Sequence, residues 1–324
     1  MGNIRTPRHG SMQFWPRVRA NRMYARVRSW PIIHVAVPLG FAGYKVGMTH
    51  LIVTDNRKTS KTKGEDIHMP VTILECPPLK IASVRLYRHA PQGLQLIKEH
   101  RASLDKEVGR RLVLSKNPSQ HSQGIDALTA DDFDVLRITV YTQPKLIGFK
   151  KKPEIFELAL GGKKEEQLSY VKVHWGKEIA VNDVFKDGQM VDIHAVTKGK
   201  GYQGPVKRFG VTLRSHKSEK TKRGPGSLGA WRGQGHMMYR VAHAGQMGFH
   251  LRTEYNKWLI KIANNPEEVN TKGGFVRYGN IKNSYVFIKG SLSGPCKRLI
   301  RFTYPIRSTP LAEAPRIVSV YQNQ

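Results

Sequence analysis

The residues best able to do chemistry in this chain lie between Thr197 and Lys261, and they are cations and flat side chains. Residues 198–262 hold fourteen Lys or Arg against two acids, Glu219 and Glu254. A segment this basic requires an anionic partner. Because phosphates attract cations and unpaired bases stack on π-faces, the pattern predicts binding of folded RNA. The flat side chains between the cations are Tyr202, Phe209, Trp231, His236, Tyr239 and His243.

The predicted RNA contacts fall on this basic stretch and on the N-terminal segment. On the basic stretch the predicted phosphate contacts are Lys198, Lys200, Lys207, Arg208, Lys222, Arg223, Arg232, Arg240, Arg252 and Lys257. On the N-terminal segment the predicted RNA-binding residues are Arg8, His9, Arg17, Arg19 and Arg26. Trp231 stands among glycines in GPGSLGAWRGQG, so we expect it to stack on RNA, the alternative being a small local core with Leu228 and Met237.

A glycine motif in the same stretch resembles a dinucleotide site. Gly199, Gly201 and Gly204 form GxGxxG after a predicted strand. Pro205 follows at once, so we expect no helix N-terminus that could hold a pyrophosphate. We interpret the glycines as a turn that brings the backbone close to RNA phosphate.

Two further motifs, and the composition of the basic stretch itself, predict neither a catalytic nor a metal site. His236, His243 and His250 recur every seven residues, but glycines interrupt any helix that would align them and no fourth ligand is present. We expect His236 to contact RNA instead. The acids of TADD, residues 129–132, are typical of a helix cap or turn. Because the basic stretch lacks convergent acids, bases and nucleophiles, we predict no catalysis, no cofactor, no metal and no small-molecule substrate.

Composition supports a nucleic-acid partner. The 324 residues carry a net charge of +30, with a pI near 10.3, and such an excess points to nucleic acid. No run approaches the roughly 20 apolar residues that span a bilayer, so we expect no membrane partner. Cys76 and Cys296 are the only cysteines and form no CxxC pair, which predicts inert thiols in a reducing compartment.

The charge is uneven along the chain, and this predicts the domain organisation. Residues 1–30 contain seven cations and no acid, whereas residues 91–197 contain sixteen cations and fifteen acids. We therefore expect a basic N-terminal arm, disordered until it meets RNA, and a nearly neutral folded insert. A targeting peptide is a weaker alternative for the arm, because prolines and His34 interrupt its apolar run. The predicted domains are an arm at 1–38, a discontinuous β core at 39–90 and 186–324, and an α/β insert at 91–185.

Hydrophobic patterning predicts a mainly β chain. β-Branched alternation indicates two strands around Gly47, two more within 69–90, and later strands in 133–142, 153–160 and 189–199. Near the end, GGFVRYG, NSYVFIKGSL, RLIRFTYP and RIVSVYQ also read as strands. Helices are expected at 91–114, from the spacing of its apolar residues, at 165–175, and at 251–264. Short strands near both ends enclosing long insertions predict an antiparallel barrel whose loops carry the function.

Several motifs together resemble a known family. PRHGS, LGFAGYKVGMTHLIVTD, VTKGKGYQGPVKRFG and GSLGAWRGQGHMMYRVAHAGQMGFHLRTEYNKW are similar to the large-subunit ribosomal protein L three family, in its archaeal and eukaryotic branch. The resemblance covers nearly the whole chain. One departure is that His216 does not lie at the spacing before Trp231 that the family's eukaryotic members show, so no role is assigned to it.

The resemblance implies a fold, a location and partners. It implies a six-stranded antiparallel translation-protein-type β-barrel with inserted α/β, a basic arm, and a long central loop that threads rRNA toward the peptidyl transferase centre. It also implies a cytoplasmic protein of the large ribosomal subunit that supports subunit assembly, with large-subunit rRNA and neighbouring ribosomal proteins as partners. In this family the loop tryptophan lies near the A-site side of that centre, and GAW places it at Trp231. The alternatives are an RNA-modifying or RNA-processing enzyme that uses the same basic surface, and a nucleotide-binding oxidoreductase that rests on GxGxxG alone.

Overall fold

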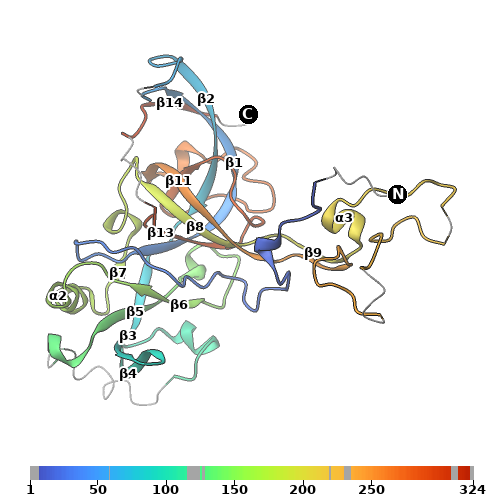
Figure 1. Ribbon diagram of the computed structural model, residues 1–324. Helices are drawn as coiled ribbons and strands as arrows, with labels where there is room; N and C mark the ends of the chain where they lie inside the picture. Colours follow the sequence, from blue (N-terminus) through green and yellow to red (C-terminus); the bar gives the residue numbers. More distant parts are fainter. Residues whose placement is uncertain are drawn as a thin grey trace. The chain divides into compact units, whose positions relative to one another are not determined.

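A ring of six strands organises most of the chain in the computed structural model (Figure 1). The largest sheet has the order β13-β8-β11-β12-β2-β1-β14, and β13 also pairs with β1, so six of the seven strands close on themselves. The strands are β1 (Gly40–Thr54), β2 (Asp66–Glu75), β8 (Met190–Val196), β11 (Leu251–Ala263), β12 (Tyr285–Lys289), β13 (Leu299–Thr303) and β14 (Ile317–Val320). The prediction of a mainly β chain is confirmed.

The structure describes residues 7–57, 59–114, 125, 128–218, 220–229, 235–307 and 313–321. The chain divides into two compact units. The larger unit comprises residues 24–195 and 253–324, and the smaller unit comprises residues 1–23 and 196–252. Each unit therefore joins segments that are far apart in the sequence.

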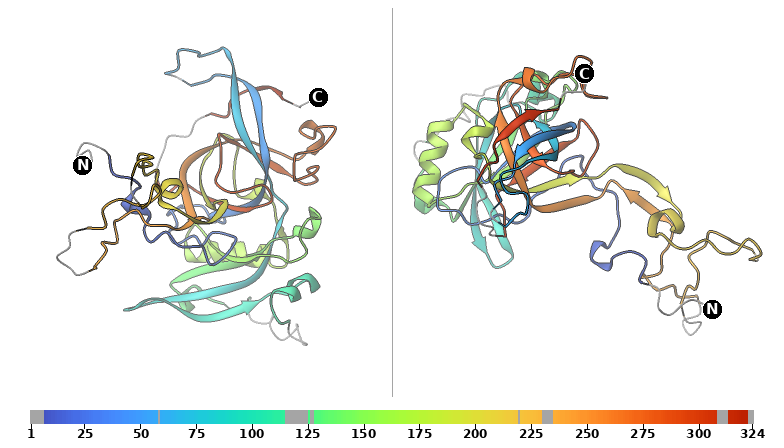
Figure 2. Two further views of the ribbon diagram at one scale, coloured as in Figure 1. Left: turned by 90° about the vertical axis from the view of Figure 1, so that its right-hand side faces the viewer. Right: turned by 90° about the horizontal axis from the view of Figure 1, so that it is seen from above.

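A second sheet of the larger unit has the order β4-β3-β5-β6, with β7 also paired to β3. Figure 2 shows it from two further directions. Its strands are β3 (Leu79–Ala90), β4 (Gly93–Arg101), β5 (Val135–Tyr141), β6 (Ile155–Ala159) and β7 (Glu178–Ile179). Helix α2 (Lys164–His174) contributes Leu168 and Val171 to the main core. The predicted helix at 165–175 is thus confirmed. Because β3 begins at Leu79, the second sheet includes residues that precede position 91.

The other helical segments described in the larger unit are short 3-10 turns. They are η2 (Lys106–Arg110), η3 (Ala130–Asp132), η4 (Pro144–Leu146), η5 (Val181–Asp183) and η7 (Pro266–Glu268). In η3, Thr129 and Asp132 form a capping box, as the TADD pattern predicts. No helix in the described ranges is long and apolar enough to cross a membrane.

Aromatic side chains fill the main core of the larger unit. Phe302 on β13 is fully buried, and its ring lies 5.1 Å from that of Phe185 and 5.9 Å from that of Phe41. Cys76 is buried against the same cluster, and burial raises the pKa of its thiol well above the usual value. A thiol in this state is unreactive, which agrees with the prediction for Cys76.

Two predicted helices are strands instead. Residues 93–101 form β4, because Ala90 pairs with Gly93 in a tight hairpin and Gly93 adopts a φ of 118°. Within the sequence predicted as the second helix, residues 258–260 are all buried and lie on β11, between β8 and β12. For β11, helical spacing is ambiguous because part of the strand is buried on both faces, and pairing with β8 and β12 decided it. For the largely exposed β4, the local hairpin with β3 decided it.

Two strand predictions are also corrected. The segment expected to form two strands around Gly47 is one strand, β1. Its pairing with β2 shifts in register between Lys45 and Gly47, which marks a β-bulge. GGFVRYG forms no strand, since Phe275 and Gly279 make only an isolated bridge that closes a turn. The other predicted strands correspond to β2, β3, β5, β6, β8, β12, β13 and β14.

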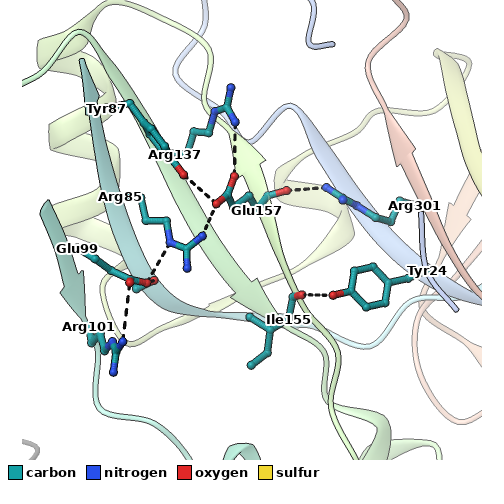
Figure 3. Close-up of polar contacts among 10 residues, drawn as sticks. Tyr24, Arg85, Tyr87, Glu99, Arg101, Arg137, Ile155, Glu157 and Arg301 are labelled. Atoms are coloured by element: carbon teal, nitrogen blue, oxygen red, sulfur yellow. Dashed lines mark hydrogen bonds and ion pairs between the residues drawn. The ribbon is translucent and has the colours of Figure 1, made fainter. Parts of the chain in front are cut away.

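Part of the N-terminal arm belongs to the core, which corrects the expectation of a disordered arm for these residues. Tyr24 and Ala25 are buried, and the Tyr24 hydroxyl donates a hydrogen bond of 2.9 Å to the Ile155 carbonyl (Figure 3). Arg301 donates to the Ala25 carbonyl at 3.1 Å, and its guanidinium lies 4.4 Å from the centre of the Phe156 ring. Burial lowers the pKa of Arg301 to about 9. These contacts order the arm locally without RNA.

The second sheet neutralises its own charges. Glu157 accepts hydrogen bonds from Arg85, Arg137 and Tyr87, and Arg85 also donates to Glu99 at 3.1 Å (Figure 3). Burial alone would raise the pKa of Glu157, but the hydrogen bonds from Tyr87 and Arg85 outweigh it and hold the pKa below its usual value. The near-neutral composition of the insert therefore corresponds to specific ion pairs.

A buried histidine in the ring predicts how stability depends on pH. His194 lies between the Thr253 and Thr303 hydroxyls, at 3.0 and 3.2 Å, and burial, with a smaller effect of Arg301, lowers its pKa to about 4. The unfolded chain binds this proton near pH 6.5, so the stability contributed by neutral His194 is complete above pH 6.5 and is lost as the pH falls toward 4. The loss is about 3 kcal/mol.

Urea unfolding of the full chain at several values between pH 7 and pH 4 measures this effect. His194→Asn should be less stable than wild type at pH 7, and should lose less stability than wild type on acidification. Identical slopes for wild type and His194→Asn would contradict the assignment.

Candidate nucleic-acid interface

The smaller unit concentrates the positive charge of the protein. Its two segments, residues 1–23 and 196–252, contribute five and twelve Lys or Arg, and Glu219 is the only acid in either segment. Such a unit cannot neutralise itself. Its cations therefore create a strong positive potential that favours a polyanion.

A two-stranded ribbon forms the base of this unit. Strand β9 (Gly199–Gln203) pairs in antiparallel fashion with β10 (Gly245–Gly248). Gly248 adopts a φ of 69°, and a Cβ atom there would lie 2.1 Å from the Lys198 carbonyl oxygen. Only glycine allows the two backbones to approach this closely.

The N-terminal segment folds onto this ribbon within the same unit. The Ala20 amide donates to the Phe249 carbonyl at 2.8 Å, and His250 Nδ1 lies 2.9 Å from the Val18 carbonyl. His250 is buried in this contact, and burial lowers its pKa. Two segments that are far apart in the sequence thus form one surface.

Two exposed arginines of the N-terminal segment also make contacts within the unit. Arg8 donates to the Arg240 carbonyl at 3.1 Å. The Arg19 guanidinium lies 5.4 Å from the centre of the Phe249 ring. Neither contact neutralises the arginine, so both charges add to the potential of the unit.

Aromatic rings hold the segments together. Trp15 follows the 3-10 turn η1 (Met12–Phe14), and its ring stacks on Phe209 with centroids 6.0 Å apart. Tyr239 meets the edge of Trp15 at 6.3 Å, and the Arg17 guanidinium lies 4.6 Å from the Phe209 centroid. This aromatic cluster supplies apolar burial that the unit otherwise lacks.

Arg208 is committed to the backbone of its own unit. Its guanidinium donates to the carbonyls of Gln246 at 3.0 Å, His243 at 2.9 Å and Arg17 at 3.4 Å. Burial and the nearby Arg17 lower the pKa of Arg208. A planar fork with several donors suits this bridging role, whereas a lysine could not reproduce it. Arg208 therefore ties together the segments that carry the other cations.

Two other predicted contacts have partners within the protein. The Arg252 guanidinium lies 4.5 Å from the Phe14 ring centroid, and burial lowers its pKa. On the larger unit, Lys257 forms an ion pair with Glu254 at 3.0 Å. Both side chains retain their charge, but the protein fixes their positions.

A further group of predicted contacts faces solvent without an acidic partner among the described residues. Its members are exposed cations that the structure brings to the smaller unit. They are Arg8, Arg19, Lys198, Lys200, Lys207, Lys222, Arg223 and Arg240. His236 is exposed on the same unit, His9 is half-buried there, and Arg26 is exposed on the larger unit. Trp231 and Arg232 lie outside the described residues.

The sequence raised a metal site and a dinucleotide site as alternatives. No group of three or more His, Cys, Asp or Glu in the described ranges is arranged to hold a metal ion. A helix does follow GxGxxG, which corrects the expectation that none would, because Pro205 occupies the first turn of α3 (Pro205–Phe209). This helix has only five residues and ends at Gly210, which adopts a φ of 69°. The motif therefore lacks the long helix of the dinucleotide-binding type.

Comparison with known proteins gives one family. The family model for ribosomal protein L3 matches residues 1–314. Large ribosomal subunit protein uL3 of Archaeoglobus fulgidus is 47% identical over 306 residues, covering 93% of this chain and 92% of the relative. The proteins of the same name from Methanocaldococcus jannaschii and Methanothermobacter thermautotrophicus are each 43% identical, over 326 and 327 residues, covering 98% of this chain and 97% of the relative.

The bridging role of Arg208 predicts a loss of order on substitution. Arg208→Lys keeps the charge but removes most of the carbonyl contacts, so the smaller unit should lose about 1–3 kcal/mol of local stability. Amide hydrogen exchange of residues 199–203 and 245–248 should quicken accordingly. Lys207→Ala, at the exposed neighbour, is the matched control and should leave exchange unchanged. Equal protection in wild type and Arg208→Lys would show that the guanidinium does not hold the unit.

Proposed function

This chain belongs to the ribosomal protein L3 family, and we propose that it is a structural component of the large ribosomal subunit that binds large-subunit rRNA and supports subunit assembly. The observation that carries the proposal is the composition of the smaller unit, which contains seventeen Lys or Arg and one acid. A polyanion is the partner that such a unit requires, and rRNA is the polyanion of a ribosomal protein. The role is one of binding, without catalysis.

The proposed binding surface divides the cations into two groups. The exposed group contacts phosphates directly, through Arg8, Arg19, Lys198, Lys200, Lys207, Lys222, Arg223 and Arg240. Arg17, Arg208 and Arg252 hold the unit in shape and add to its potential. Arg26, Lys257, His9, His236 and Arg232 complete the proposed set of rRNA-binding residues. The arrangement is typical of nucleic-acid-binding proteins, in which positioning contacts to phosphate outnumber base contacts.

We assign the ring of six strands to the translation-protein type of β-barrel. The pairings of β1 with β2 and β13, of β12 with β2 and β11, and of β13 with β8 are antiparallel, which supports the assignment. The proposed domains remain the arm at 1–38, the discontinuous core at 39–90 and 186–324, and the insert at 91–185. Because acids of the insert such as Glu99 and Glu157 are paired with arginines of the same sheet, we propose that the insert faces solvent or neighbouring ribosomal proteins. The basic loop at 198–262 extends toward the peptidyl transferase centre.

Salt dependence tests the proposal. Binding of the full chain to large-subunit rRNA should weaken by orders of magnitude between roughly 50 and 200 mM salt, because about six or more phosphate contacts release counterions. Reversal of two exposed cations in Lys198→Glu/Lys200→Glu should weaken binding and flatten the salt dependence. Reversal of two exposed insert lysines in Lys163→Glu/Lys177→Glu is the matched control and should have little effect. A flat salt response of the wild-type chain would refute the proposal.

The tryptophan of the basic loop gives a second test. Phosphate contacts on the rest of the unit anchor the chain, so Trp231→Ala should leave incorporation into subunits nearly normal. One stacked base is worth about 1–3 kcal/mol, enough to favour one of two rRNA conformations at the centre. The variant should therefore alter aminoacyl-tRNA accommodation or sensitivity to inhibitors of the centre, measured on purified subunits. Normal kinetics and normal drug response at full occupancy would remove this role, and loss of the protein from the subunit would make Trp231 an anchoring residue.

A further inference from the structure

Tyr202 is the most exposed tyrosine among the described residues, with 78% of its surface accessible. It lies on β9, opposite Gln246 of β10. Its ring makes no stacking or cation–π contact with another ring or cation in the described ranges. A side chain this exposed contributes little apolar burial to the unit that carries it, and its ring is accessible to a ligand.

The other flat side chains described in the basic stretch include several that serve the fold. Phe209 is buried between Trp15 and Arg17, and Tyr239 meets the edge of Trp15. The residue His243 supplies its carbonyl to Arg208. Tyr239 is itself 70% exposed, so Tyr202 differs from it in having no ring contact in the described ranges, and differs from Phe209 in being exposed.

The strand around Tyr202 is irregular. Between the pairs Tyr202–Gln246 and Gly199–Gly248, β9 has two residues, Lys200 and Gly201, where β10 has only Met247. Gly201 adopts a φ of 67°, so β9 forms a bulge one residue before the tyrosine. Bulges re-aim the side chains beside them and recur next to functional sites.

Two glycines flank this segment. Neither is required by a positive φ or by close packing, although Gly204 is also the N-cap of α3, where glycine is favoured. Gly204 has φ −69° and ψ 165°, which any residue can adopt, and a Cβ atom there would meet no atom within 4 Å. Gly199 does not have a positive φ. A Cβ atom added at Gly199 would have its nearest neighbour in the Phe249 side chain, at an ordinary van der Waals distance of 3.7 Å. Glycine at such positions leaves the backbone bare for close approach by a ligand. Exposed Lys198 and Lys200 place positive charge beside the bare backbone.

We propose that Tyr202 is a stacking platform for an unpaired nucleotide, with the sugar–phosphate backbone passing over Gly199 and Gly204 and its phosphates contacting Lys198 and Lys200. This inference rests on the proposed function and names the class of RNA that the site takes. A base has a flat face of the right size for the phenol ring, and only an unpaired base exposes that face. A paired helix would offer its phosphates to the lysines but nothing to the tyrosine.

The test uses the full chain, a single-stranded RNA decamer of mixed sequence, and the same strand annealed to its complement. Wild type should prefer the single strand. Tyr202→Leu should lose about five- to a hundredfold in affinity for the single strand, the effect of one stacked base, and little for the duplex. Tyr202→Phe retains the ring and should restore the preference. Tyr321→Leu, at another exposed tyrosine, should behave as wild type.

The glycine supplies an independent variant. Gly204→Ala suits the backbone conformation and should cost only the preference for glycine over alanine at the N-cap of α3, but its methyl group should weaken single-strand binding several-fold. Gly273→Ala is the matched control, because a Cβ there also meets nothing within 4 Å and the site lies on the larger unit. If Tyr202→Leu and Gly204→Ala bind the single strand as wild type does, the stacking site is wrong, while salt-sensitive rRNA binding would still support the proposed function. If wild type fails to bind large-subunit rRNA at all, both are overturned.

Discussion

Like-charge repulsion within the smaller unit is the constraint on which the rest of this structure depends. Seventeen cations share two short segments with one acid, and neither segment has enough apolar residues for a conventional core. The unit keeps a defined shape through contacts that tolerate positive charge. Guanidinium groups donate to carbonyls and lie over aromatic rings, as Arg208 and Arg17 do. Bare glycines such as Gly248 permit close backbone approach.

This solution gives the cations two different roles. A guanidinium that is bound to carbonyls holds segments together and still contributes its charge to the field around the unit. An exposed lysine contributes the same charge with little commitment to the fold, so it is available to a phosphate. Arg208 and Lys207 illustrate the difference. They are adjacent in the sequence, but Arg208 donates to backbone carbonyls, whereas Lys207 is exposed to solvent.

The larger unit follows the opposite rule. Its second sheet neutralises charge locally, as Glu157 does with Arg85 and Arg137, and its ring buries aromatic side chains around Phe302. Removing a charged group such as Arg301 from water is costly, and two carbonyls and an aromatic ring offset that cost in part. The larger unit can therefore fold by ordinary burial, whereas the smaller unit keeps a large positive charge that its single acid cannot balance.

Charge, motifs and two-residue alternation are local properties, so the amino-acid order was enough to predict the family and most strands. It also predicted α2 and the cap at Thr129. It could not predict that 93–101 and 251–263 are strands, since their apolar spacing also suits helices. A hairpin with β3 decided the first segment, and pairing with β8 and β12 decided the second. The same holds for the candidate site. Cations and flat side chains are equivalent in a sequence, and long-range contacts alone separate Arg208 and Phe209, which hold the fold, from Lys200 and Tyr202, which remain exposed to a ligand.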